Sequence, residues 1–181
     1  YASLEEEVKQ TFAVIDWLAL GDKAYATWHS LLYQGFRALQ AMHSFTRHSH
    51  GNITRFNLLV QNVYADATLA YEVAPGGFVQ YLNPCGWILK LTDFDSVTPN
   101  GPFAYMLKDY EDLLYCFESI LGVTETVIPE ARALVTRTRR RLDLHWGSTL
   151  LAELTELYRH HEKLNLLLFP THDQVKQTRV I

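Results

Sequence analysis

The spacing of apolar residues changes twice along this chain, and these changes constrain its fold more than any other feature. Up to Met42 and again from Lys108 onward, apolar residues recur every three or four positions, which is typical of amphipathic helices. The segments between them are short, rich in β-branched and aromatic residues, and separated by Gly, Pro, Asn and Asp. The sequence therefore predicts an α+β fold that is mainly helical, with one small β region in its middle.

Several segments combine helical spacing with signals for a helix end. The first begins at a capping box formed by Ser3 and Glu6 and ends at Gly21. In the second, which begins after Asp22, apolar residues fall on one side, so we expect a long helix that is deeply buried along one stripe. The predicted helices span residues 3–20, 22–42, 108–121, 129–141 and 148–164.

The β region is predicted to contain short strands joined by tight turns. Pro75-Gly76-Gly77 is typical of a hairpin turn, and Asn83-Pro84-Cys85-Gly86 is typical of another. The predicted strands span residues 56–64, 68–73, 77–82 and 87–94.

Composition limits the class of protein. At 181 residues the chain can form a substantial core, and we expect a single domain over residues 1–181. Hydrophobic residues make up 48% and charged residues 20%, which is ordinary globular composition. The formal net charge of -4 gives no overall basic field, so we expect neither nucleic acid nor an anionic membrane as partner. A local basic cluster is interpreted as a solvated helix face, with an anion or partner site as the alternative. It consists of Arg137, Arg139, Arg140 and Arg141.

Cysteine content and hydropathy bear on the compartment. Cys85 and Cys116 cannot form a disulfide framework and do not sit in a metal-ligand pair, which favours ordinary thiols in a reducing compartment. No apolar run approaches the roughly 18 residues of a spanning helix. The first residues lack the layout of a signal peptide. We therefore expect an intracellular protein, cytoplasmic or nuclear.

Two stretches in the middle of the chain look like catalytic signatures in which single letters differ. They read "HSHGNITRFNLLV" at 48–60 and "GWILKLTDFDSV" at 86–97. In the first, His50-Gly51-Asn52 is followed five positions on by Asn57. In the second, a predicted strand leads into Asp93-Phe94-Asp95. A helix with an aspartate, Asp109, at its start follows.

This order of elements resembles the C-terminal lobe of protein kinases, over roughly residues 22–122. There the catalytic loop reads His-Arg-Asp with Asn five places after the Asp, and a metal-binding Asp-Phe-Gly follows. The resemblance implies a kinase-like C-lobe and a role for each matching position. These positions are Asn52 for the catalytic Asp, His50 as a structural residue, Asn57 and Asp93 as nucleotide and metal ligands, and Asp109 as a buried structural anchor.

The departures from the kinase pattern matter for chemistry. Phosphoryl transfer depends on positioning and charge neutralisation, and Asn57 and Asp93 would keep the two metal-holding roles. Asn52 has no basic site near neutral pH, so the loss of a general base should lower a kinase rate by about 10²–10⁴-fold. Asp95 stands where the family has Gly, and an aspartate accepts positive φ only with a penalty. We interpret it as a solvated turn residue, with an extra metal ligand as the alternative.

Other kinase parts are missing or altered. No glycine-rich strand turn and no Val-Ala-x-Lys strand precede the first helix, so we expect no N-lobe. The interval from Asp93 to Asp109 is short and lacks Ala-Pro-Glu. An insert at about 62–85 lengthens the β region, and its aromatic residues are interpreted as core, with an interaction surface as the alternative. They are Tyr64, Tyr71, Phe78 and Tyr81.

The sequence signals for other kinds of functional site are weaker. His43, His48 and His50 lack a neighbouring Cys or Glu at ligand spacing, so we interpret them as loop and structural histidines. His160-His161 lies near a helix end and would complement the helix dipole. No Gly-x-Ser-x-Gly elbow of a hydrolase occurs.

The resemblance implies a pseudokinase-like protein that acts by binding another protein, either a kinase or a kinase's substrate. On this hypothesis no cofactor is required, and any binding of Mg-ATP is weak. The alternative is the C-lobe part of a divergent Mg-ATP-dependent phosphotransferase, with magnesium on Asp93, Asn57 and Asp95. A third interpretation is an α+β domain whose likeness to kinases is accidental.

Overall fold

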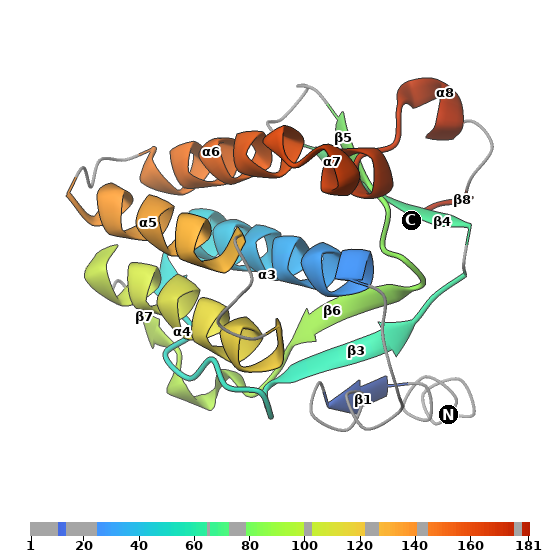
Figure 1. Ribbon diagram of the computed structural model, residues 1–181. Coiled ribbons are helices and arrows are strands. Elements are labelled where there is room, and N and C mark those ends of the chain that lie inside the picture. Colours follow the sequence, from blue (N-terminus) through green and yellow to red (C-terminus); the bar gives the residue numbers. More distant parts are fainter. Residues whose placement is uncertain are drawn as a thin grey trace.

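The computed structural model has the mainly helical α+β fold that the sequence predicts (Figure 1). It describes residues 11–13, 25–64, 66–72, 79–99, 103–121, 127–140, 145–175 and 179–181. The helices are α3 Tyr25–Thr46, α4 Phe103–Leu121, α5 Val127–Arg139, α6 Trp146–His160, α7 Glu162–Leu168 and α8 His172–Val175, with a 3-10 helix η1 at Phe94–Ser96. The strands are β1 Thr11–Ala13, β2 His48–Ser49, β3 Leu58–Asn62, β4 Ala67–Glu72, β5 Val79–Leu82, β6 Trp87–Leu91, β7 Thr98–Pro99 and β8 Arg179–Val180.

Helix α3 runs through the middle of the molecule and contacts α4, α6, α7 and β6 (Figure 1). The prediction that it would be buried along one stripe is wrong, because these neighbours cover it on several sides. Polar residues such as His29 and Gln34 are buried beside Leu31 and Phe36. Tyr25, an apolar-stripe position of the predicted helix over residues 22–42, is exposed.

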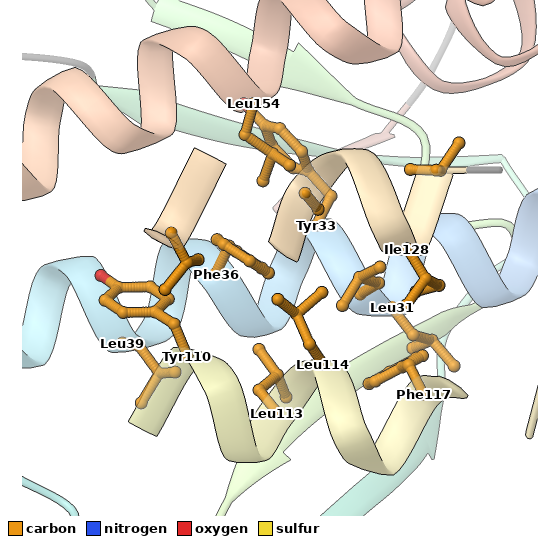
Figure 2. Close-up of a cluster of buried hydrophobic side chains, with 14 of the residues drawn as sticks. Leu31, Tyr33, Phe36, Leu39, Tyr110, Leu113, Leu114, Phe117, Ile128 and Leu154 are labelled. Carbon is orange, nitrogen blue, oxygen red and sulfur yellow. The ribbon is translucent and has the colours of Figure 1, made fainter. Parts of the chain in front are cut away.

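The core forms where the helices meet around α3 (Figure 2). Aromatic and aliphatic side chains from α3 pack against α4, α5 and α6, and their removal from water is the main source of stability. The side chains labelled in the close-up are Leu31, Tyr33, Phe36 and Leu39 of α3, Tyr110, Leu113, Leu114 and Phe117 of α4, Ile128 of α5 and Leu154 of α6.

The buried polar side chains of α3 serve the neighbouring strands. Strand β6 is the edge of its sheet, so its outward backbone groups need other partners. Gln34 supplies them: its Nε2 donates to Trp87 O at 3.1 Å, and its Oε1 accepts from Leu89 N at 2.8 Å. Ser30 Oγ likewise donates to Asn83 O at 2.7 Å. These bonds fix the β region against the central helix.

Strand β1 corrects a prediction. The prediction of a helix over residues 3–20 is wrong at Thr11–Ala13, which form a strand. This strand pairs antiparallel with β3, and Phe12 lies opposite Val60. Strand β3 also pairs antiparallel with β6, from Leu58 opposite Leu91 to Asn62 opposite Trp87. The free edge of β3 offers backbone donors and acceptors, and satisfying them outweighs the local helical pattern. The capping box at Ser3 and Glu6, and Gly21, lie outside the described residues.

The insert forms a second sheet with the order β5-β4-β8. Strands β4 and β5 are antiparallel, with Leu69 opposite Leu82, and β8 adds in parallel, with Ala67 opposite Arg179. The sequence did not predict β8. The predicted turn at Asn83–Gly86 is present, with Trp87 N donating to Pro84 O at 3.0 Å. The predicted turn at 75–77 lies outside the described residues.

Two further helix predictions differ from the structure in ways that matter for the site and the core. Helix α4 begins at Phe103, before the predicted start at Lys108, so Asp109 lies in its second turn and not at its opening. The helix predicted over 148–164 is two helices, because His161 is extended with φ -85° and ψ 92°. The change of direction lets Leu164 and Leu168 of α7 reach the same core as Leu154 of α6. In the described part of the chain, no helix is long and apolar enough to cross a membrane.

Candidate functional site

Asp109 is the centre of the polar contacts around the first motif. Its side chain is 1% exposed and projects from α4. Oδ2 accepts the backbone N–H of His50 at 2.7 Å, and Oδ1 accepts that of Gly51 at 2.9 Å. His43 Nε2 of α3 donates to Oδ2 at 2.9 Å. A carboxylate has only acceptor positions, so these three donors satisfy it and hold the chain at residues 50–51 against α4.

Residues 48–57 contact residues 92–97. We term residues 48–57 the Asp109 loop, because the Asp109 carboxylate holds them, and residues 92–97 the Asp93 turn. The link is His50, a fully buried side chain whose Nε2 donates to Thr92 O at 3.0 Å. The His50 ring also lies 5.0 Å from the ring of Phe94. Next to these contacts, β2 pairs with β7, so that Ser49 lies opposite Thr98. The loop and the turn are therefore held together at several points.

Gly51 is required by the same approach. Its φ of +76° is a conformation that side-chain-bearing residues rarely adopt, and a Cβ on it would lie 2.7 Å from Ser96 O. Any side chain at this position would begin with a Cβ that collides with the Asp93 turn. The glycine thus allows the loop and the turn to pack closely.

The structure brings Asn52, Asn57 and Asp93 together. Asn52 Nδ2 donates to Asp93 Oδ2 at 3.1 Å, and Asn57 Nδ2 donates to Asn52 O at 2.8 Å. Thr92 N in turn donates to Asn57 O at 3.0 Å. Asn57 is buried, Asn52 is half-buried and Asp93 is exposed, so the cluster opens to solvent at the aspartate. The amide of Asn52 must present its nitrogen to Asp93, because a carboxylate only accepts.

The backbone strain in the Asp93 turn lies at a different residue from the one the sequence indicated. Asp93 has φ 63° and ψ 70°, in the left-handed region. Asp95 lies in η1 and is exposed, and it is not among the residues with positive φ. Asp95, at the position that the resemblance assigns to the Gly of the kinase motif, therefore carries no left-handed penalty. Holding Asp93 in that region is a cost that the contacts of His50 and Asn52 offset.

The metal-binding capacity of the cluster rests on oxygen donors. Asp93 has a carboxylate, and the Oδ1 of Asn57 is not used in its bond to Asn52. Oxygen ligands of this kind suit Mg²⁺, which commonly takes one or two carboxylates together with substrate phosphates. Within the described residues, no group of three or more His, Cys, Asp or Glu side chains is placed to hold a metal ion.

His43 was not recognised from the sequence as part of this site. It lies at the buried end of α3, and its ring also packs 5.3 Å from Tyr110. Its Nδ1 and the hydroxyl of Tyr110 are buried and have no hydrogen-bond partner among the described residues. Burial, with a smaller contribution from the Asp109 charge, raises the pKa of Tyr110 well above its usual value. The sequence interpretation places His43 only among the loop and structural histidines, because no local spacing marks its contact with Asp109, which lies 66 residues away.

The remaining candidates lie elsewhere. Arg137 pairs with Glu153 at 3.4 Å and Arg139 with Glu111 at 2.7 Å, which are exposed ion pairs on a helix surface. Arg141 lies outside the described residues. Both thiols are free, and burial raises the pKa of each to about 11, which makes them poor nucleophiles at neutral pH.

The aromatic residues of the insert have mixed surroundings. Tyr64 is exposed, whereas Tyr71 is half-buried beneath the guanidinium of Arg37. Tyr81 packs 6.1 Å from His172. Phe78 lies outside the described residues.

Comparisons of the chain with models of protein families, with curated proteins and with solved structures found no match. The likeness to kinases therefore rests on the motifs and on the contacts among the residues that carry them.

Proposed function

We propose that this chain is a pseudokinase-like protein that acts by binding another protein and does not transfer phosphate. The observation that carries the proposal is the hydrogen bond from Asn52 Nδ2 to Asp93 Oδ2, 3.1 Å long. At the position of the catalytic aspartate, the chain presents a donor to its neighbour in place of an acceptor.

The chemistry of this contact opposes catalysis. An amide cannot take a proton from a hydroxyl near neutral pH, so the group that should serve as general base is lacking. The same amide occupies an oxygen of Asp93. An aspartate at residue 52 would instead lie against the Asp93 carboxylate, and two like charges at this distance disfavour each other. Asn52 thus stabilises the metal-free arrangement of the cluster.

The contacts of Asp109 support the kinase-like part of the proposal. A buried carboxylate on a core helix holds the loop that carries His50 and Asn52, and His50 joins this loop to the Asp93 turn. These contacts are the kind that the resemblance implies for a structural anchor and a structural histidine. They keep the loop in place without any requirement for turnover.

Exposed aromatic residues flank the cluster and suit a protein partner. Phe56 directly precedes Asn57 and is 66% exposed, and Phe94 directly follows Asp93 and is 51% exposed. Aromatic residues are enriched where proteins bind each other, because they bury large apolar areas with few rotatable bonds. We propose that these exposed aromatic residues contact a protein kinase or the substrate of one.

Binding to a panel of purified protein kinases and their substrates, measured by biolayer interferometry, tests the proposal. We expect at least one partner, with binding weakened roughly tenfold or more by Phe56→Ser. Leu166→Ser, at a 73% exposed position on α7, is the matched control and should leave binding unchanged. Absence of any partner, or equal losses in the two variants, would contradict the proposal.

A second candidate, a divergent phosphotransferase, is favoured by one observation. Asn57 and Asp93 both contact Asn52, so two oxygen donors for Mg²⁺ belong to one small cluster. Bound Mg²⁺ would supply charge neutralisation for phosphates. A ligand at a hundredfold excess over Kd stabilises the folded state by about 2.7 kcal/mol. On our proposal Mg-ATP produces no clear thermal shift; a shift that Asp93→Ala abolishes would favour this second function.

A further inference from the structure

A groove of about 1020 Å³ lies on a part of the molecule that the candidate site does not use. It is bordered by β5, α6 and the chain that follows α7, and residues of α3 and α5 also belong to its lining. Its apolar lining includes Val79, Leu134, Leu151, Leu157 and Phe169. None of the lining residues belongs to the Asp109 loop or the Asp93 turn. The volume is that of a small-molecule site.

Arg37 of α3 lines this groove and is only 6% exposed. Its guanidinium lies 4.7 Å from the centre of the Tyr71 ring, and within the described residues it makes no ion pair or hydrogen bond. Taking a charge out of water is costly unless a counter-charge and hydrogen bonds replace the lost hydration. A ring face offers only part of that compensation.

The other arginines of the groove are different. Arg137 is paired with Glu153 at 3.4 Å, and Arg159 is paired with Glu156 at 2.6 Å. In these exposed pairs, the charge of each arginine is balanced by that of its glutamate. Arg37 is therefore the cation with unused donors in the lining of the groove, as far as the chain is described.

A second polar group in the lining also lacks a partner. Gln80 Oε1 accepts the hydroxyl of Tyr33 at 3.0 Å, and that hydroxyl contacts Thr155 Oγ1 at 2.7 Å. The Nε2 of Gln80 is buried and donates to no acceptor in the structure as described. Burial raises the pKa of Tyr71 and of Tyr33, so both phenols stay neutral and neither supplies a negative charge to Arg37. Two sets of donors in one groove thus lack an acceptor.

We propose that this groove binds a small organic carboxylate with an apolar body. The carboxylate would accept from the guanidinium of Arg37, and the apolar body would lie along the leucine and phenylalanine lining. A single negative charge fits better than a phosphate dianion, because Glu153 and Glu156 lie in the same lining and would oppose a second charge. This site is independent of the proposed function.

The test uses the chain of residues 1–181 and the fluorescence of 8-anilinonaphthalene-1-sulfonate, which has an apolar body and one negative charge. Decanoate should displace this probe, whereas decanol, which has the same chain length and no charge, should need at least about tenfold more. Equal displacement by decanoate and decanol would overturn the proposal, as would displacement by inorganic phosphate alone.

Two pairs of variants locate the site. Arg37→Gln should weaken decanoate binding at least about tenfold, while Arg132→Gln, outside the groove lining, should not. If Arg37→Gln does not fold, substitutions at Ala152 test the proposal instead, because this residue is exposed and lines the groove. Ala152→Glu should weaken decanoate binding relative to Ala152→Gln, which has the same size and no charge. Equal binding by these two variants would overturn the proposal.

Discussion

Two charged side chains, Asp109 and Arg37, lie buried in different parts of the fold and have different surroundings. Asp109 receives hydrogen bonds from two backbone amides and a histidine ring, which come from the Asp109 loop and from α3. Arg37 packs against the face of the Tyr71 ring and lines an open groove. Both groups are more than nine-tenths buried, so the difference is in their partners and not in their depth.

The difference separates a structural role from a binding role. A buried charge whose hydrogen-bonding capacity is used within the chain fixes the segments that supply its partners. A buried charge whose hydrogen-bond donors lack partners within the chain destabilises the folded state, and it favours binding of a ligand that supplies the acceptors. Asp109 therefore explains why the loop with Asn52 has a defined position, and Arg37 indicates where the chain binds something else.

The largest effect is expected at Asp109. Asp109→Ala removes the acceptor for the N–H groups of His50 and Gly51 and should lower the free energy of unfolding by about 3–5 kcal/mol. Asp112→Ala, on the same helix, breaks only the partly exposed pair with Lys108 and should cost less than about 1 kcal/mol. Urea unfolding of both variants measures the difference. Similar losses in the two variants would show that Asp109 has no special role.

The next effect concerns the contact between the Asp109 loop and the Asp93 turn. Gly51 and Gly86 both have positive φ, of 76° and 81°, but only at Gly51 would a Cβ meet another residue. Gly51→Ala should cost about 2–4 kcal/mol, because it adds a collision with Ser96 O to the backbone penalty. Gly86→Ala should cost only the backbone penalty, about 1–2 kcal/mol. Equal costs in thermal unfolding would mean that the loop and turn are not closely packed.

A smaller effect, on stability at alkaline pH, is expected from Tyr71, whose ring lies against the Arg37 guanidinium. Burial raises the pKa of Tyr71 above its usual value, so the unfolded chain loses this proton first as pH rises. The folded state then binds more protons, and the free energy of unfolding falls as pH rises above about 10. Tyr71→Phe should make this decline shallower, with Tyr115→Phe, at an exposed position, as the control for loss of a phenol. Urea unfolding between pH 8 and 11 tests it; identical slopes in the two variants would contradict the burial of Tyr71.

The smallest effect is expected where a charge is neither buried nor open to a groove. Glu111→Gln removes the pair with Arg139, whose two side chains are 32% and 51% exposed. Solvent screening leaves such pairs worth less than about 1 kcal/mol. Thermal unfolding at low and high salt should show a difference near zero, and a loss comparable to that of Asp109→Ala would remove the distinction between buried and surface charges.

The sequence predicted what depends on local pattern. Helical spacing located α4, α5 and α6, and turn residues located the β region. The motif order also selected Asn52, Asn57 and Asp93, which are joined by hydrogen bonds, and Asp109, which accepts the backbone N–H of His50. The roles that the resemblance implies for these four residues stay predictions. In these cases the signal is carried by residues that are near in sequence or that share a recognisable spacing.

The sequence did not predict what depends on contacts between distant segments. Strand β1 forms because β3 offers a free edge, which outweighs the local helical pattern at Thr11–Ala13. The burial of α3 on several sides depends on how α6 and α7 return across it. The groove combines Arg37, Gln80 and Ala152 from three elements, so no spacing in the sequence marks it. Gly51 had a signal, a glycine in place of arginine, but its meaning required the position of Ser96.

We propose above all that Asn52 stands in place of the proton acceptor that a phosphotransferase would need. The most direct measurement is transfer of radiolabelled phosphate from Mg-ATP to the chain itself and to protein substrates, with Asp93→Ala prepared in parallel to reveal contaminating kinases. Our account predicts equal, background transfer in the two preparations. Transfer by the unmodified chain that disappears in Asp93→Ala would contradict it.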